Sequence, residues 1–302
     1  MDPMAILERV LDTPRVVYVR SILDTYGRAP GGLLANGLAF ATLFAALPVA
    51  LLVLGAAGLF VGDPTAQEDL ARALKELFPP LASFVDQALQ AVTAGATAAS
   101  IFGLVGTVWA VSQLYVTLDV AFSRIFSETP ERDLVRRTVR GFLWVGGLIA
   151  LVAGLIVLGT VASIVSTLFP GDQFSLDVVR GVLGSPIFLL IVGVVVTGAI
   201  YRVLPATTPA FSSIWPAAVV VGIVVVVLSQ VFVVLAPILV GAAKLAGSLA
   251  TAFIALAWLS FTFQAVLYGA SWVRVAEDRR VKLTALALGA AAPPAEPGGG
   301  GE

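Results

Sequence analysis

The sequence predicts an all-α, polytopic membrane protein with six transmembrane helices. Six long apolar stretches contain no charged residue, and all 18 basic and 19 acidic residues lie between or beyond them. Charged residues form 12% of the 302 residues, against about 25% in soluble domains. Helices of this length can cross a hydrocarbon core of about 30 Å. The stretches are 36–61, 98–118, 141–169, 182–200, 214–240 and 246–273, within a membrane domain of residues 35–275.

The segment before the first span, residues 1–34, mixes charged and apolar residues. Its apolar residues recur at helical spacing between residues 4 and 26, and Pro14 interrupts them. This pattern predicts a broken amphipathic segment at the cytoplasmic interface. A surface helix packed on the bundle explains the same spacing.

Pro48 lies at the centre of the first span. Because proline has no N–H, it frees the carbonyl of Phe44 and should kink the helix. Pro48 is therefore a candidate hinge, although a kink can also accommodate packing.

The loop 62–97 between the first two spans contains a second apolar periodicity. Its apolar residues recur at steps of three and four, and Pro79-Pro80 falls among them. The pattern predicts two short amphipathic helices separated by the two prolines. We expect them to cap the outer face of the bundle or to rest on the bilayer.

Basic residues predict the orientation of the chain. Fourteen of the 18 Lys and Arg residues lie in the N-terminal segment, after the second and fourth spans, or after the sixth span, and four lie in the other loops. Because cytoplasmic segments are enriched in Lys and Arg, both termini are predicted to be cytoplasmic. Residues 276–302, rich in Ala, Pro and Gly toward their end, are predicted to form a disordered cytoplasmic tail.

Polar residues within the spans are the candidate functional residues, because burying them in lipid is costly. We predict that they line a cavity open to the cytoplasm between the first, second, fifth and sixth spans; interhelical hydrogen bonding is the alternative. Asp119 needs a partner, and Arg124 or Arg202 can supply it. The candidate cavity residues are Asn36, Gln113, Asp119, Gln230 and Gln264.

Glycines within the spans have a different predicted role. We expect them to mark close contacts between helices, since glycine lets backbones approach. The positions are Gly103, Gly106, Gly147, Gly154 and Gly193.

Several functional classes are excluded by residues that the sequence lacks. The chain has no cysteine and no histidine, so it has no disulfide, no Cys or His metal ligand, and no Ser–His or Cys–His catalytic pair. It has no Walker loop and no charged relay within a span. We therefore predict neither an enzyme nor an ion pump, and we predict no metal or cofactor.

An arginine cluster follows the second span. We interpret it mainly as a topology signal that can also hold anionic lipid headgroups, at about 1 kcal/mol per basic residue. Nucleic-acid binding is not expected, because no aromatic-bearing soluble domain accompanies the cluster. The four arginines are Arg132, Arg136, Arg137 and Arg140.

Several motifs between residues 35 and 275 resemble the YihY/BrkB family of bacterial inner-membrane proteins. The most specific is Tyr201-Arg202-Val203-Leu204-Pro205, followed by Ile214-Trp215-Pro216-Ala217. Further similar segments are Ala35-Asn36-Gly37-Leu38-Ala39-Phe40 with Pro48, Gly106 with Trp109-Ala110, Leu118-Asp119, and Gly247-Ser248-Leu249 with Trp258. The family commonly ends its last span with Gly-Ala-Glu, whereas this chain has Gly269-Ala270-Ser271.

The resemblance implies a multi-pass protein of the bacterial cytoplasmic (inner) membrane. The family is linked to virulence, serum resistance and transport of envelope lipids or small molecules, and the absent carboxylate at Ser271 argues against ion coupling through it. A former ribonuclease label does not fit a chain without histidine. We predict a transporter or lipid-handling permease of the cell envelope; the alternative is a membrane scaffold or envelope-maintenance factor that transports nothing. The sequence is compatible with an oligomer.

Overall fold

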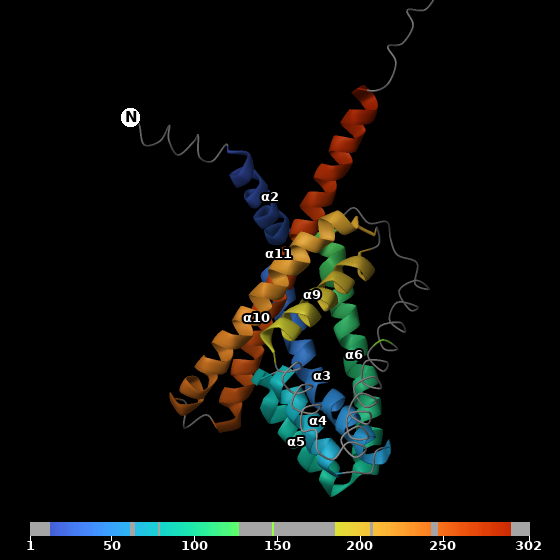
Figure 1. The fold of residues 1–302 in the computed structure, drawn as a ribbon, viewed down its shortest axis with the longest axis vertical. Coiled ribbons are helices and arrows are strands. Elements are labelled where there is room, and N and C mark those ends of the chain that lie inside the picture. Colours follow the sequence, from blue (N-terminus) through green and yellow to red (C-terminus); the bar gives the residue numbers. More distant parts are fainter. Residues whose placement is uncertain are drawn as a thin grey trace, which may run out of the picture.

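The computed structural model describes residues 13–60, 64–77, 79–126, 185–205, 208–242 and 247–290, and residue 147 alone. Every regular element in these residues is a helix, which confirms the all-α class for this part (Figure 1). The elements are α2 (Pro14–Arg28), α3 (Gly31–Phe60), α4 (Pro64–Leu77), the short 3₁₀ helix η1 (Pro79–Leu81), α5 (Ala82–Ala94), α6 (Ala96–Ile125), α9 (Pro186–Val203), α10 (Phe211–Ala242) and α11 (Gly247–Ala290).

Four of these helices are long and apolar enough to cross a membrane. Their candidate spans are Gly31–Ala56, Ile101–Ile125, Phe211–Leu235 and Ala250–Ala287. They coincide with the first, second, fifth and sixth predicted spans. The fourth predicted span becomes α9, with a shorter apolar part at Leu190–Val203. The third, 141–169, lies outside the described residues apart from Gly147, so the six-span count stays a prediction.

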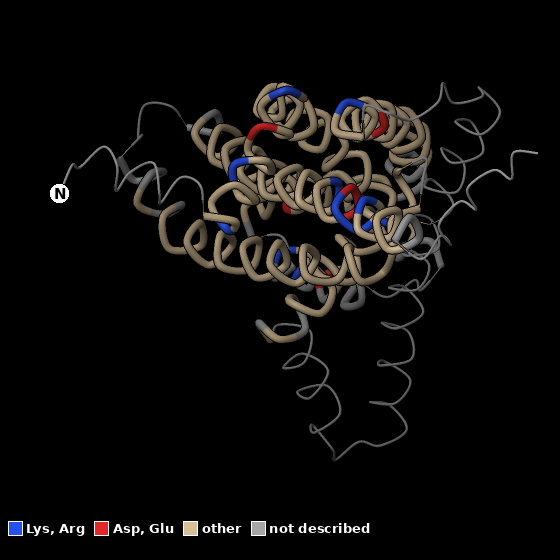
Figure 2. The backbone as a smooth tube through the Cα atoms, turned by 90° about the horizontal axis from the view of Figure 1, so that it is seen from above, with Lys and Arg blue, Asp and Glu red and all other residues tan. Residues whose placement is uncertain are grey.

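The outer surface of the described helices is apolar. Leu33, Phe102 and Val234 are 73%, 76% and 69% exposed, and charged residues occupy few positions in the helices (Figure 2). A protein surrounded by water seldom exposes so many large apolar side chains together. The surface therefore fits a lipid environment.

α3 and α6 pack closely through two glycines. A Cβ on Gly103 would lie 2.6 Å from the backbone nitrogen of Leu52, and one on Gly106 would lie 3.1 Å from Cβ of Pro48. The predicted close-contact role of both glycines is therefore confirmed. Pro48 lies inside α3 and faces Gly106, so its ring is part of this packing; its role as a hinge stays a prediction.

α9, α10 and α11 form the second part of the bundle. Gly193 of α9 faces Gly222 of α10, with 3.7 Å between the position of a Cβ on Gly193 and the Cα of Gly222. This contact confirms the prediction for Gly193. The prediction for Gly147 is wrong, because nothing in the described part of the chain lies within 4 Å of the position of its Cβ, and Gly154 lies outside the described residues. α10 is fastened to α11 by the indole of Trp258, which donates a hydrogen bond to Ser229 Oγ at 3.3 Å.

α2 packs against α11 at one end of the bundle. The rings of Tyr26 and Tyr268 stack there with centroids 3.8 Å apart, and the guanidinium of Arg279 lies 5.8 Å from the ring centroid of Tyr18. The largest buried core cluster joins α2, α3, α6, α9, α10 and α11. It includes Tyr26, Leu38, Phe122, Tyr201, Ile214 and Leu267.

The C-terminal segment differs from its prediction, and the N-terminal segment is described only from residue 13 onward. Pro14 begins α2, because proline is well tolerated at the first helical position; residues 1–12 lie outside the described residues. The predicted disordered tail 276–302 is wrong over 276–290, where α11 continues. No glycine or proline interrupts residues 270–288, and an ion pair of 3.1 Å between Arg274 and Asp278 supports the helix at i,i+4.

The break at Pro79-Pro80 is confirmed, because α4 and α5 lie on either side of η1. Their position relative to the outer face and the bilayer stays a prediction. α5 and α4 pack lengthwise against the second half of α3 (Figure 1), and Gln67 donates a hydrogen bond to the carbonyl of Leu54 at 3.2 Å. Periodicity predicted an apolar face but not the helix that covers it. The shared cluster contains Ala50, Leu54, Ala71, Val85, Ala88 and Val92.

Candidate functional site

A group of polar side chains joins α3 to α11 within the predicted spans. Ser260 donates a hydrogen bond from Oγ to Oδ1 of Asn36, and Gln264 donates from Nε2 to Ser260 Oγ at 3.3 Å. Two predicted cavity residues, Asn36 and Gln264, thus come together through Ser260. Ser260 does not stand out in the sequence, since a serine in an apolar helix usually bonds a carbonyl of its own helix.

The described hydrogen bonds satisfy this group only in part. Asn36 is exposed, and Ser260 and Gln264 are half-buried. Among the described residues, Nδ2 of Asn36 has no hydrogen-bond partner. The exposed residue Asn36 thus has, inside a predicted span, an amide N–H₂ without a partner among the described residues.

Gln113 lies on α6, one turn before a residue that contacts α3. Thr117, one turn further along α6, packs against Gly37, with 3.7 Å from its methyl group to the position of a Cβ on that glycine. Gln113 shares a face with Thr117 because the two are four residues apart, and Gln113 is exposed. The two helices α6 and α11, which both pack on α3, therefore each carry an amide, Gln113 and Gln264.

Asp119 and Gln230 occupy other environments. Asp119 is buried, with 6% of its surface exposed, and it takes part in a polar interaction. Gln230 is exposed on α10, and within the described part of the chain no hydrogen bond connects it to Asn36 or Gln264. The described contacts thus link two of the five predicted residues, Asn36 and Gln264, and they do so through Ser260.

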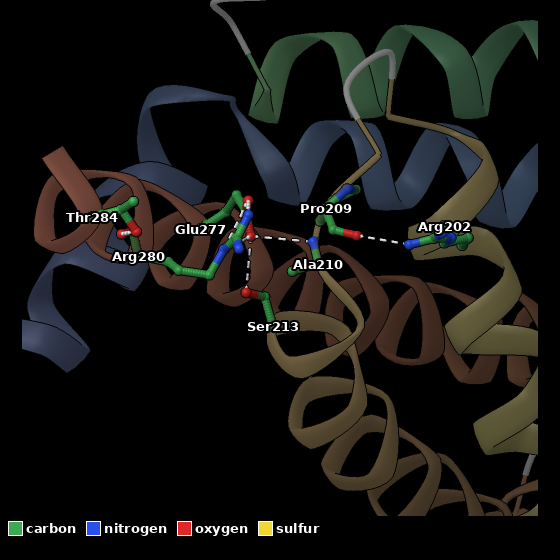
Figure 3. Close-up of polar contacts among 7 residues, drawn as sticks. All are labelled: Arg202, Pro209, Ala210, Ser213, Glu277, Arg280 and Thr284. Atoms are coloured by element: carbon green, nitrogen blue, oxygen red, sulfur yellow. Dashed lines mark hydrogen bonds and ion pairs between the residues drawn. The ribbon is translucent and has the colours of Figure 1, made fainter. Parts of the chain in front are cut away.

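The arginines proposed as partners of Asp119 have environments of their own. Arg124 is exposed near the end of α6. Arg202 donates a hydrogen bond from Nη1 to the carbonyl of Pro209 at 3.0 Å (Figure 3). Their pairing with Asp119 stays a prediction.

A second polar group fastens the start of α10 to α11. Oε2 of Glu277 accepts hydrogen bonds from the backbone N–H of Ala210 at 3.3 Å and from Oγ of Ser213 at 2.9 Å (Figure 3). Arg280 donates to Oε1 of the same carboxylate at 2.7 Å. The first N–H groups of a helix lack intrahelical partners and carry partial positive charge. Glu277 therefore caps α10 from a distant part of the chain.

Glu277 lies beyond the hydrocarbon core. The candidate span Ala250–Ala287 has 38 residues, about 57 Å of helix, whereas the core is about 30 Å thick. The uncharged part of α11 ends before Arg274, so the charged turns after it project from the membrane.

The pKa of Glu277 is lowered in the folded protein. Burial of the carboxyl raises this pKa, but the hydrogen bonds from Arg280, Ser213 and Ala210 and the charge of Arg280 lower it by more.

The motif Tyr201–Pro205 ties α9 to its neighbours. Tyr201 is fully buried, and its hydroxyl donates to the carbonyl of Val266 in α11 at 2.7 Å. Leu204 and Pro205 are buried after it. Together with the hydrogen bond from Arg202 to Pro209, these contacts fix the connection between α9 and α10.

Ser271 occupies the position at which the resembled family commonly has glutamate. It is completely buried, and its hydroxyl donates to the carbonyl of Leu267 at 2.9 Å within α11. Ser271 is thus satisfied within its own helix. The nearest carboxylate further along α11 is that of Glu277, which serves the cap of α10.

Two further predictions, the absence of a metal site and the contacts with lipid headgroups, remain predictions. In the described residues, no group of three Asp or Glu side chains could hold a metal ion. The predicted headgroup contacts Arg132, Arg136, Arg137 and Arg140 lie outside the described residues.

The comparisons with known proteins agree with the resemblance noted from the motifs. The family model described as Virulence factor BrkB matches residues 22–292. The match includes every described span and both polar groups. Neither the curated proteins nor the solved structures contain a match to the chain.

Proposed function

We propose that this chain, which belongs to the Virulence factor BrkB family, is a permease of the cell envelope. In this proposal it moves a polar or amphipathic molecule, such as a lipid with its headgroup, across the cytoplasmic membrane. The observation that carries the proposal is the exposed amide of Asn36 within the Asn36–Ser260–Gln264 group.

The position of this amide favours contact with a molecule outside the bundle. Asn36 lies five residues inside α3, about 7.5 Å from its first residue. An unsatisfied polar group in hydrocarbon costs several kcal/mol. A headgroup, a polar solute or water can supply the acceptors that the described residues do not give to Nδ2.

Interhelical hydrogen bonding alone explains the positions of Asn36 and Gln113 less well. A hydrogen bond that only holds two helices together should be covered by them, as the bond between Trp258 and Ser229 is: Trp258 is only 4% exposed. Asn36 is exposed instead, and Gln113 on the neighbouring helix is exposed as well. Polar groups on α3 and on the two helices that pack against it suit a path along α3.

The experiment is flux through proteoliposomes that contain the purified protein. Release of a panel of polar solutes and scrambling of fluorescent phospholipids are compared with protein-free vesicles and with Asp119→Ala. We expect at least one substrate class to move faster with the protein present. Equal rates for the whole panel would refute the permease and favour the scaffold.

A further inference from the structure

The helical hairpin formed by α4, η1 and α5 has one apolar face and one charged face. Its apolar residues Ala71, Val85, Ala88 and Val92 are buried against α3. Its opposite face exposes Glu68, Arg72, Asp86, Gln87 and Gln90. Lys75 of α4 and Asp86 of α5 form an ion pair of 2.9 Å across the hairpin, with side chains 35% and 52% exposed.

The tip of the hairpin reaches well inside the ends of the neighbouring helices. η1 contacts both α10 and α11, and Leu81 packs against a cluster that includes Phe232 and Trp258. Phe232 lies ten residues before the end of α10, and Trp258 lies eleven residues after the start of α11. These separations correspond to about 15 Å along each helix.

The helix next to the hairpin is apolar on its outer surface at the same level. Leu51 of α3 packs against the hairpin cluster, and Gly103 of α6 lies against Leu51 and Leu52. Around Gly103, α6 exposes Phe102 by 76% and Val105 by 65%. Side chains of this kind at this exposure fit lipid, so the hydrocarbon region reaches at least the level of Gly103, beside the hairpin.

We propose that α4 and α5 form a re-entrant hairpin whose charged face lines a water-filled vestibule, open on the side of the membrane opposite to the termini. Charged side chains are costly in lipid and occur in membrane proteins where they face a watery cavity or one another. The ion pair between Lys75 and Asp86 and an interaction of Arg72 satisfy part of the charge, and water in the vestibule solvates the exposed polar groups of this face. The vestibule admits hydrophilic solutes to the level of the hairpin.

Cysteine labelling tests the vestibule directly, because the natural chain has no cysteine. The variants Gln87→Cys and Arg72→Cys place a thiol on the charged face, and Val105→Cys places one on the exposed surface of α6 at a similar level. A membrane-impermeant maleimide is added to the side opposite to the termini, in vesicles of defined orientation. Labelling of the denatured protein in detergent verifies that each thiol is present. Size-exclusion elution of the undenatured protein verifies that each variant is folded.

We expect the reagent to label both Gln87→Cys and Arg72→Cys, and to label Val105→Cys at least tenfold more slowly. If the reagent fails to label either Gln87→Cys or Arg72→Cys, the proposal is overturned, since the charged face would then not be in contact with water. Equally fast labelling of Val105→Cys would also overturn it, because the hairpin would then lie outside the membrane. These readouts do not depend on transport, so the vestibule and the permease can fail separately.

Discussion

Gly269 leaves the space that the hydroxyl of Tyr201 occupies. A Cβ on Gly269 would overlap this hydroxyl and would lie 2.6 Å from Cγ2 of Val221. The same hydroxyl donates to the carbonyl of Val266 at 2.7 Å. α9, α10 and α11 therefore meet at one glycine of the last helix.

Replacing this glycine tests the importance of the contact. Gly269→Ala should lower the unfolding free energy by about 1–3 kcal/mol, since overpacking forces the core to shift. Thermal unfolding in detergent measures the change. Gly27→Ala in α2 is the matched control, because nothing lies within 4 Å of the position of its Cβ. An unchanged midpoint for Gly269→Ala would contradict this packing.

The contact between α3 and α6 gives a second prediction. Gly103→Ala should destabilise the protein by about 1–3 kcal/mol, because the new methyl group meets the backbone of α3 at 2.6 Å and backbone yields little. Gly37→Ala on the same interface meets only Thr117, at 3.7 Å, and should cost far less. Similar melting temperatures for the two variants would show that the helices are not packed as described.

The cap on α10 gives a third prediction. Glu277→Gln replaces the charged carboxylate that accepts hydrogen bonds from Ala210, Ser213 and Arg280. The substitution should lower the unfolding free energy by about 1–2 kcal/mol. Arg280→Gln should cost less, since Arg280 is 53% exposed and the bonds to Ala210 and Ser213 remain. Urea unfolding in mild detergent compares the variants. A larger loss for Arg280→Gln would reverse the assigned roles.

Glu277 also predicts how stability depends on pH. Its pKa is lowered in the folded protein, so its contribution is complete above the ordinary value of 4.5 and is lost as the pH falls through the folded pKa. The unfolding temperature of the natural chain should therefore fall on acidification below about pH 5. Glu277→Gln should show a shallower fall, and parallel curves for the two proteins would contradict the pKa shift.

The described spans were predictable because the apolar character of a membrane helix is visible in each residue. The end of α11 was not, because charged residues such as Arg274 and Glu277 end the hydrophobic run without ending the helix. Similarly, the apolar spacing in 62–97 indicated helices on both sides of Pro79-Pro80, but periodicity does not identify the partner surface. Only the structure placed this segment along α3.

The candidate site was predictable in part for the same reason. Asn36 and Gln264 stand out as amides in apolar stretches, and the structure joins them. Ser260, which connects them, and Glu277, which caps α10, do not stand out. Serine is common in membrane helices, and Glu277 lies among charges that the sequence explains by solvation alone.

The measurement that tests the central claim most directly is the initial transport rate of matched variants in proteoliposomes. With the substrate that the natural protein moves fastest, the double variant Asn36→Leu and Gln264→Leu should lower the rate at least tenfold. Gln230→Leu, which removes an exposed amide outside the Asn36–Ser260–Gln264 group, should keep a rate close to that of the natural chain. Equal rates for all three proteins, with equal amounts of folded protein in the vesicles, would contradict a path along α3.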